Sequence, residues 1–146
     1  MQDEPRSGGP EQISLQIPCR YSYLRIVRQA VADLCAQTCV SEFKAAQLEM
    51  AVDEICAELI EKLRQRAGGD GAQPLLVILR RESGGIVSEV YYSGQKVEFP
   101  ALSADAAKST EDAAALGSYV VHRFVEKVEH VRDPERGWCV RIRKAL

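Results

Sequence analysis

The sequence has few of the residues that mark a disulfide-bonded or metal-binding protein. It contains two histidines, and its five cysteines are Cys19, Cys35, Cys39, Cys56 and Cys139. Their number is odd, none lies in a Cys-x-x-Cys pair, and no histidine stands at ligand spacing beside them, which argues against a zinc site or a disulfide framework. Cys35 and Cys39 can face the same way on a helix, so a redox or metal role for that pair is the alternative. We interpret the cysteines as small buried apolar residues in a reducing compartment.

An excess of charge of one sign and long apolar runs are also lacking. Nineteen basic residues stand against 21 acidic ones, and the net charge of −2 gives no reason to expect a phosphate backbone or an anionic membrane as partner. No apolar run reaches a membrane-spanning length, and the N-terminus MQDEPRSGGPEQ has no apolar core of the kind a signal peptide needs. We therefore expect a cytoplasmic protein whose residues 1–12 form a disordered leader.

The rest of the chain is sufficient for one folded domain. Of its 146 residues, 46% are hydrophobic, and a chain of this length buries roughly two-thirds of the surface that it exposes when unfolded. No internal repeat divides it. The sequence therefore predicts a single domain over residues 13–146.

The first half of this domain has one strand signal followed by two helix signals. QISLQIP alternates apolar and polar residues before Pro18, which is typical of a short strand. From Tyr21 to about Thr38 the apolar residues recur at helical spacing. Ser41 is a good N-cap for a longer helix that runs to about Ala67, where GGDG ends it.

The second half contains two hairpin signals. PLLVILRRESGGIVSEVYYSG has two apolar runs around a glycine turn, and VEHVRD and GWCVRIRKAL flank PERG in the same way. Between the hairpins we expect a long mobile segment and then a helix from Ser118 to about Val128. This order of elements suggests an α+β fold, a two-layer sandwich in which three helices cover one face of a mostly antiparallel sheet.

Acidic residues follow one edge of the predicted helix that contains MAVDEICAELIEKL. Its apolar residues lie within one sector of the helical wheel, and these are Leu48, Val52, Ile55, Cys56, Leu59 and Leu63. Glu54, Glu58 and Lys62 are four residues apart and form a stripe beside that sector. Two carboxylates on successive turns can act as a general base or hold magnesium. Glu58 and Lys62 also have the spacing of an ordinary ion pair, so a solvated helix edge is the alternative interpretation.

The run LEMAVDEICAELIEKL, with the strand and helix before it and the hairpin after it, resembles the Glu-x-x-x-Asn helix of the anti-sigma-factor serine kinases. Those proteins belong to the GHKL superfamily of ATPases, with histidine kinases and gyrase. The resemblance extends from ISLQIP, which starts at residue 13, to VRIRKAL at the C-terminus. It implies a GHKL (Bergerat-type) sandwich with a pocket for ATP and magnesium.

The resemblance assigns roles to three residues of the acidic stripe and one neighbour. Asp53 and Glu54 match the family's Asp-Glu dipeptide, and Glu54 takes the place of the catalytic general base. Glu58 stands where the family has the magnesium-binding Asn, so it is the residue that would hold the metal. A carboxylate can bind magnesium, but it adds negative charge beside a triphosphate. Lys62 takes the place of a frequent histidine and offsets part of that charge.

The second family motif, Asp-x-Gly-x-Gly, corresponds to YSGQK at the end of the first hairpin. Tyr92 stands where the Asp accepts a hydrogen bond from adenine, Gly94 matches the first glycine, and Lys96 replaces the second. Losing one charge-assisted hydrogen bond costs roughly 1.5–3 kcal/mol, which is about 10- to 150-fold in affinity. The sequence therefore predicts a weakened adenine site.

The third motif, a Gly-x-Gly pair that contacts the phosphates, corresponds to ALGS, in which only Gly117 remains. The lid before it, about residues 96–116, has no glycine between Pro100 and Ala115. The departures thus affect the metal site, the adenine site and the phosphate lid together.

These departures favour an anti-sigma-factor-like regulatory module of the partner-switching type, a pseudokinase that binds ATP weakly or not at all and needs no cofactor. The alternative is an active ATP-dependent protein serine kinase that phosphorylates an anti-sigma-factor antagonist, in which Glu54 acts on the substrate serine and Glu58 holds magnesium. Nucleotide sensing without transfer, and a histidine-kinase-like module derived from a larger protein, are further alternatives.

The resemblance also implies a homodimer and protein partners, a sigma factor and an antagonist, and hence a role in transcription regulation without direct nucleic-acid contact. A contact patch for such partners could consist of Tyr21, Tyr23 and Arg25, but we prefer the interpretation that the aromatic rings pack against the sheet. We also expect Trp138 to lie in the core. We expect no phosphotransfer through His122 or His130, because both lie in or just after the last helix, away from the site.

Overall fold

The computed structural model describes residues 11–38, 40–98 and 121–145. Its elements are β1 (Gln12–Ile17), the short 3₁₀ helix η1 (Tyr21–Tyr23), α1 (Leu24–Gln37), α2 (Glu42–Ala67), β2 (Leu75–Glu82), β3 (Gly85–Tyr92), β4 (Lys127–Asp133) and β5 (Gly137–Ala145). Residues 121–124 are also helical.

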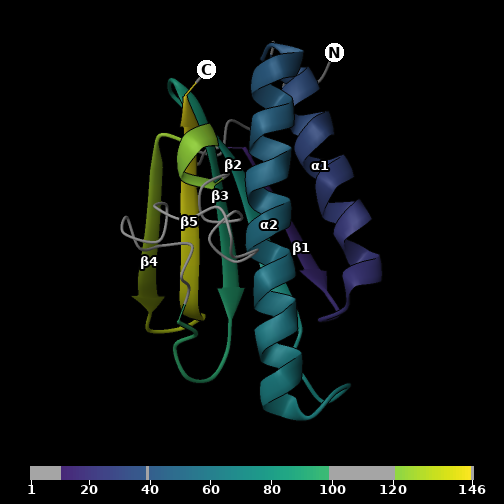
Figure 1. Cartoon of the computed structure of the whole chain (residues 1–146). Helices are drawn as coiled ribbons and strands as arrows, with labels where there is room; N and C mark the ends of the chain where they lie inside the picture. The colour runs from purple at the N-terminus through teal and green to yellow at the C-terminus, as the bar shows by residue number, and fades with distance from the viewer. Residues whose placement is uncertain (1–10, 39, 99–120, 146) are drawn as a thin grey trace, which may run out of the picture.

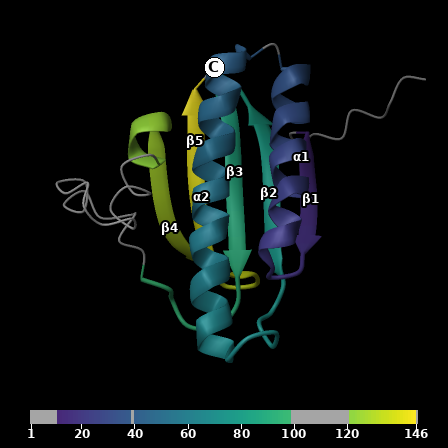
Figure 2. The same cartoon turned by 45° about the vertical axis from the view of Figure 1, so that its right-hand side comes forward.

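The five strands form one sheet in the order β1-β2-β3-β5-β4, and all neighbouring strands are antiparallel. Figures 1 and 2 show α1 and α2 across one face of this sheet, with the helical residues 121–124 on the same face. The predicted α+β two-layer sandwich is therefore confirmed. None of the described helices is both long and apolar enough to cross a membrane.

The long helix α2 begins and ends as the sequence predicts. The Ser41 hydroxyl accepts a hydrogen bond from the Lys44 amide, which satisfies one of the free N–H groups of the first turn. Gly68 ends the helix with a left-handed backbone (φ 73°), a conformation that a residue with a side chain adopts only at a cost.

The core lies between the helices and the sheet. The predicted apolar sector of α2 faces it, and its members Leu48, Val52, Ile55, Cys56, Leu59 and Leu63 are all buried. Alternate residues of β2 and β3, such as Val77 and Val90, supply the opposite wall of the core. Since burial of apolar area is the main stabilising term in folding, this layer holds α2 in place over the sheet.

The two hairpins are confirmed, but the predicted end of the last helix is wrong. The helical residues end at position 124 instead of near Val128, and β4 begins at Lys127, one residue before the predicted strand VEHVRD. Two backbone hydrogen bonds explain the change: the Val125 amide donates to the Val121 carbonyl, and the Glu126 amide already donates to Arg143 of β5. Pairing with β5 therefore takes over from the helix within two residues.

The predicted leader and lid lie mostly outside the described residues. Of the leader, residues 1–10 lie outside, and Gln12 is already the first residue of β1. Of the lid, only residues 96–98 are described, and they form neither helix nor strand.

Candidate functional site

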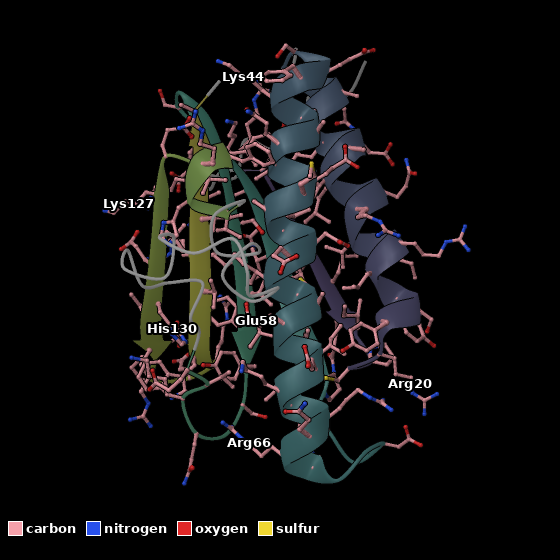
Figure 3. The ribbon with its side chains drawn as sticks, viewed as in Figure 1. Arg20, Lys44, Glu58, Arg66, Lys127 and His130 are labelled. Atoms are coloured by element: carbon pink, nitrogen blue, oxygen red, sulfur yellow. The ribbon has the colours of Figure 1, made fainter. Side chains whose placement is uncertain are left out.

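The acidic stripe of α2 runs along the flank of the helix that borders the core. Glu54 and Lys62 are half-buried, whereas Glu58 is only 9% exposed. Figure 3 shows Glu58 in the half of the molecule where β3 ends. Among the described residues Glu58 and Lys62 do not form an ion pair, although they are one turn apart. The interpretation of a solvated helix edge is therefore wrong for Glu58.

Burial changes the acidity of both carboxyls in this stripe. It raises the pKa of Glu58 to about 7; Lys62 works against this shift, and the neighbouring Glu54 and Glu61 add to it. Burial also raises the pKa of Glu54, and the charge of Asp53 adds to that effect. A carboxyl with a pKa near neutrality is partly protonated under ordinary conditions, so Glu58 is a poor fixed charge but a good proton acceptor or donor.

Glu58→Gln is expected to raise the free energy of unfolding by about 2 kcal/mol at pH 8 and to change it little at pH 4. The pKa is about 4.5 in an unfolded chain and about 7 in the folded one, so the folded state holds the extra proton between these values. Stability then falls as the pH rises through this window. The full shift corresponds to about 3 kcal/mol, and contact with solvent reduces the expected gain. Urea unfolding across this pH range measures it.

The matched control for this prediction is Glu61→Gln, a change at an exposed position of the same helix. It removes one carboxylate near Lys62 without uncovering a buried group, so its effect is expected to stay within about 0.5 kcal/mol at every pH. Equal pH profiles for the two variants would contradict a buried, proton-binding Glu58.

Asp53, the first residue of the matched dipeptide, points to the neighbouring helix. Its carboxylate accepts a hydrogen bond from Arg28 of α1 at 3.1 Å, and the pair is partly exposed. A surface ion pair of this kind contributes at most about 1 kcal/mol. In the described structure Asp53 therefore joins α1 to α2.

Tyr92, the last residue of β3, lies inside the fold. The residue is 1% exposed and packs in the core that α2 covers. Its hydroxyl accepts a hydrogen bond from the Val97 amide at 2.9 Å and lies 2.7 Å from the His130 Nε2. The hydroxyl is thus engaged with both the segment that follows β3 and the edge strand β4.

His130 completes this polar group and corrects the prediction that it lies away from the site. It is on β4, and Val140 of β5 is its register partner, on the helix-facing side of the sheet (Figure 3). Its ring contacts Trp138 edge-on at 5.4 Å, and the Lys96 ammonium lies 5.3 Å from the centroid of a Trp138 ring. Burial, aided by Lys96, lowers the pKa of His130. Trp138 packs against the core, as predicted.

Gly94 lies in the turn after β3, beside a cavity of about 180 Å³ between this turn and the C-terminal end of α2. Its left-handed backbone (φ 91°) requires glycine or costs strain. Arg66 lines the same cavity and donates hydrogen bonds to the carbonyls of Gln95 (2.7 Å) and Lys96 (3.4 Å). Arg66 and Tyr92 therefore both bind the backbone of residues 95–97, which follow this turn.

The remaining predicted site residues do not join this group. Gly117 lies outside the described residues. His122 is exposed, and Tyr21 is 52% exposed while Tyr23 packs partly against the core. In the described part of the chain, no three His, Cys, Asp or Glu side chains are grouped as metal ligands would be.

The described cysteines are buried thiols, which confirms the structural interpretation for four of the five. Cys19, Cys35, Cys56 and Cys139 form no disulfide, and burial raises the pKa of each. A thiol with a raised pKa is a weak nucleophile, so these residues are suited to packing. Cys39 lies outside the described residues.

Sequence reasoning missed two residues of this region, Arg28 and Arg66, and placed a third, His130, away from it. Each makes its contact with a residue at least 25 positions away, namely Asp53, Gln95 and Tyr92. No local spacing signals such a contact. Only the register of β4 and β5 could have placed His130 on the helix-facing side with Tyr92.

The comparisons with known proteins bear on the fold and the family. A chain in the crystal structure of the SiaB-SiaC complex from Pseudomonas aeruginosa has a similar fold, with a TM-score of 0.64 and 16% identity over 90% of this chain and 88% of that chain. No curated protein sequence matches. The sequence model of the histidine kinase-like ATPase domain matches residues 17–144, from the end of β1 to near the end of β5. This chain therefore belongs to the histidine kinase-like ATPase domain family, as the resemblance predicts.

Proposed function

We propose that this protein is a regulatory binding module of the anti-sigma-factor type, which keeps the ATPase fold but binds ATP weakly or not at all. The observation that carries the proposal is the placement of Tyr92. The family has an adenine-binding Asp at this position, and here a tyrosine ring fills the core and its hydroxyl is already engaged by Val97 and His130.

The tyrosine would oppose adenine binding in two ways. A phenol hydroxyl that already accepts from the Val97 amide offers a poorer acceptor to the adenine amino group than a carboxylate does. Moving the ring aside would break its contacts in the core and leave the Val97 amide unsatisfied, which costs about 1–3 kcal/mol for the amide alone. Both effects reduce the affinity for the nucleotide.

The environment of Glu58 supports the same conclusion for magnesium. A metal ligand must be deprotonated, and the pKa of this carboxyl is about 7. Magnesium usually binds one or two carboxylates together with substrate phosphates and waters, and among the described residues Glu58 belongs to no group of three His, Cys, Asp or Glu side chains that could hold a metal ion. The residues present therefore do not fit a family-type magnesium-ATP site, and we derive no reaction step through one.

A module that has lost its nucleotide can still regulate by binding proteins. The similar fold in the SiaB-SiaC complex comes from an assembly of two different proteins. By analogy, we propose that this chain binds a sigma factor, an anti-sigma-factor antagonist, or both, that it forms homodimers, and that it acts in the cytoplasm on transcription without contacting nucleic acid or membrane.

One observation favours the alternative, an active protein serine kinase. Burial raises the pKa of Glu54, at the general-base position, and this is the direction that makes a carboxylate a better proton acceptor. In this alternative Glu54 would act on the hydroxyl of a serine in the antagonist. The choice between the two functions depends on whether the pocket binds the nucleotide.

The deciding measurement is thermal unfolding of the purified protein with and without millimolar magnesium-ATP. A ligand at 100 times its dissociation constant adds about 2.7 kcal/mol of stability, which corresponds to roughly 5–10 °C in a domain of this size. We expect no shift relative to a magnesium-only control. That control separates metal binding at Glu58 from nucleotide binding.

A rise of several degrees in the unfolding temperature with magnesium-ATP, and none with magnesium only, would overturn the proposed function. Kinase activity towards a candidate antagonist would then be measured, with Glu54→Ala as the inactive variant and Glu61→Ala as the matched surface control. Transfer of phosphate that Glu54→Ala abolishes, and Glu61→Ala does not, would establish the kinase.

A further inference from the structure

The two edge strands of the sheet, β1 and β4, differ in how they are protected against pairing with a further strand. The charged residues of β4 are Lys127, Glu129, Arg132 and Asp133. β1, with the sequence QISLQI, has no charged residue, and the nearest prolines, Pro10 and Pro18, lie outside it. Charged side chains and prolines are the usual protection of an exposed edge. β1 is therefore the unprotected edge of this sheet.

The backbone of β1 presents hydrogen-bonding groups to its free edge. The Glu11 carbonyl accepts from the Arg81 amide at 3.2 Å, so the residues that bond to β2 are the odd-numbered ones. The N–H and C=O groups of Gln12, Ser14 and Gln16 therefore point away from β2. Among the described residues no strand pairs with this side of β1. An extended segment of another chain can satisfy all of these groups.

The helix-facing side of β1 is also incompletely covered. Leu75 and Val77, which face the core from β2, are 0% exposed. Ile13 and Leu15, their counterparts on β1, are only partly buried. A further strand beside β1 would remove more of this apolar surface from water, which is favourable.

The flank of α1 that faces away from α2 has a shallow cavity of about 450 Å³. Its lining residues are Arg25, Ile26, Gln29, Ala30 and Asp33. Arg28 binds Asp53 of α2, and Ile26 lies about 160° around the helix from Arg28, so Ile26 points to the other side. On that side β1 forms the rim of the sheet (Figure 2). We call this surface the Ile26 flank; Ile26 itself is 47% exposed.

Two opposite charges lie along the Ile26 flank. None of the ion pairs formed by the described residues includes Arg25 or Asp33. Asp33 accepts a hydrogen bond from the neutral Gln29 amide at 3.0 Å. The two charged residues are about 12 Å apart along the helix, which is the length of about four residues of a strand. A segment that carries the opposite charges at that spacing would complement both.

We propose that β1 and the Ile26 flank bind an extended segment of a protein partner, which adds a strand antiparallel to β1. The segment carries an acidic, an apolar and a basic residue at alternate positions, in that order. This inference rests on the proposed binding function and names its surface and the chemistry of the partner. Backbone hydrogen bonds to the edge supply affinity in this mode of recognition, and alternate side chains supply specificity.

The order of the three residues follows from the direction of the chains. Every neighbouring pair in this sheet is antiparallel, which is also the more stable arrangement per residue. α1 runs opposite to β1, so Arg25 lies towards the Ile17 end of β1 (Figure 1). An antiparallel segment starts at that end, so its acidic residue meets Arg25, its apolar residue covers Ile26 and Ala30, and its basic residue meets Asp33.

The test uses a synthetic peptide with glutamate, isoleucine and lysine at alternate positions and threonine between them. Amide hydrogen exchange of the full chain is followed by NMR with and without this peptide. We expect a saturating amount to slow the exchange of the Gln12, Ser14 and Gln16 amides about tenfold or more. Absence of this protection would overturn the proposal. Protection without peptide that grows with protein concentration would also overturn it, because a second copy would then occupy the edge.

Ser14→Pro is the variant that blocks the edge, and Ser14→Ala is its matched control. Proline removes an N–H that points away from β2, so the β1–β2 pairing is kept. We expect Ser14→Pro to raise the dissociation constant of the peptide about tenfold or more and Ser14→Ala to change it less than about twofold. Equal affinities of the two variants would contradict strand addition at β1.

A charge exchange tests the Ile26 flank and decides the matter if Ser14→Pro does not fold. We expect Arg25→Glu to bind the peptide about fivefold more weakly than the wild type does. A second peptide, with lysine in place of the glutamate, is expected to prefer Arg25→Glu to the wild type. The absence of this reversal would overturn the proposed orientation. The magnesium-ATP measurement does not involve this edge, so failure of the surface and failure of the proposed function remain distinguishable.

Discussion

Replacing Glu89 with alanine is expected to lower the free energy of unfolding by about 3 kcal/mol. The Glu89 side chain is 2% exposed and binds two arginines, Arg80 and Arg141, the latter at 2.9 Å. It also accepts a hydrogen bond from the Tyr91 hydroxyl at 3.0 Å. Removing one partner from a buried ion pair costs about 3–5 kcal/mol, because the other charge stays buried and unpaired. The arginines keep some contact with water, so the lower end of that range applies.

Urea unfolding at neutral pH measures this loss, and Glu82→Ala is the matched control. Glu82 also pairs with two arginines, but its side chain is 33% exposed, so its removal is expected to cost less than about 1 kcal/mol. Unfolding is followed at two protein concentrations, which separates any loss of dimer from a loss within the domain. Equal losses for Glu89→Ala and Glu82→Ala would contradict the assigned role of burial.

The regular elements could be predicted because their signals are local. The spacing of the α2 apolar residues, the Ser41 cap and the Gly68 stop all act within one or two helical turns. The end of the last helix was wrong because a distant strand decides it: the Glu126 amide donates to Arg143, 17 positions along the chain. Such competition between helix and sheet leaves no trace in local spacing.

The candidate site could be predicted only in part, for the same physical reason. The spacing of Glu54, Glu58 and Lys62 identified the stripe, but a solvated edge and a buried one have the same spacing. Burial of Glu58 depends on how α2 lies over the sheet. Similarly, Glu89 meets Arg141, 52 positions along the chain, only through the register of β3 and β5.

Replacing Tyr92 with alanine is expected to lower the free energy of unfolding by about 4 kcal/mol, the largest effect of a single change considered for this chain. Removal of a large buried aromatic side chain costs about 3–5 kcal/mol through lost contacts and the cavity that remains. The change also leaves the Val97 amide without its acceptor and His130 without the tyrosine hydroxyl. Denaturant unfolding measures the loss.

Two companion variants separate the parts of this effect. Tyr92→Phe keeps the ring and removes only the hydroxyl, so its expected cost is about 1–2 kcal/mol. Tyr21→Ala removes a tyrosine that is 52% exposed and is expected to cost less than about 1 kcal/mol. If Tyr92→Ala were as mild as Tyr21→Ala, the ring would not be part of the core.

The Tyr92→Ala variant also distinguishes two reasons for weak nucleotide binding. If the ring alone blocks the pocket, Tyr92→Ala should gain stability from magnesium-ATP although it is less stable than the wild type. We expect no gain, because the variant restores space but not the carboxylate that accepts from adenine, and Glu58 is still partly protonated near neutral pH. A shift in Tyr92→Ala and none in the wild type would show that volume alone closes the site.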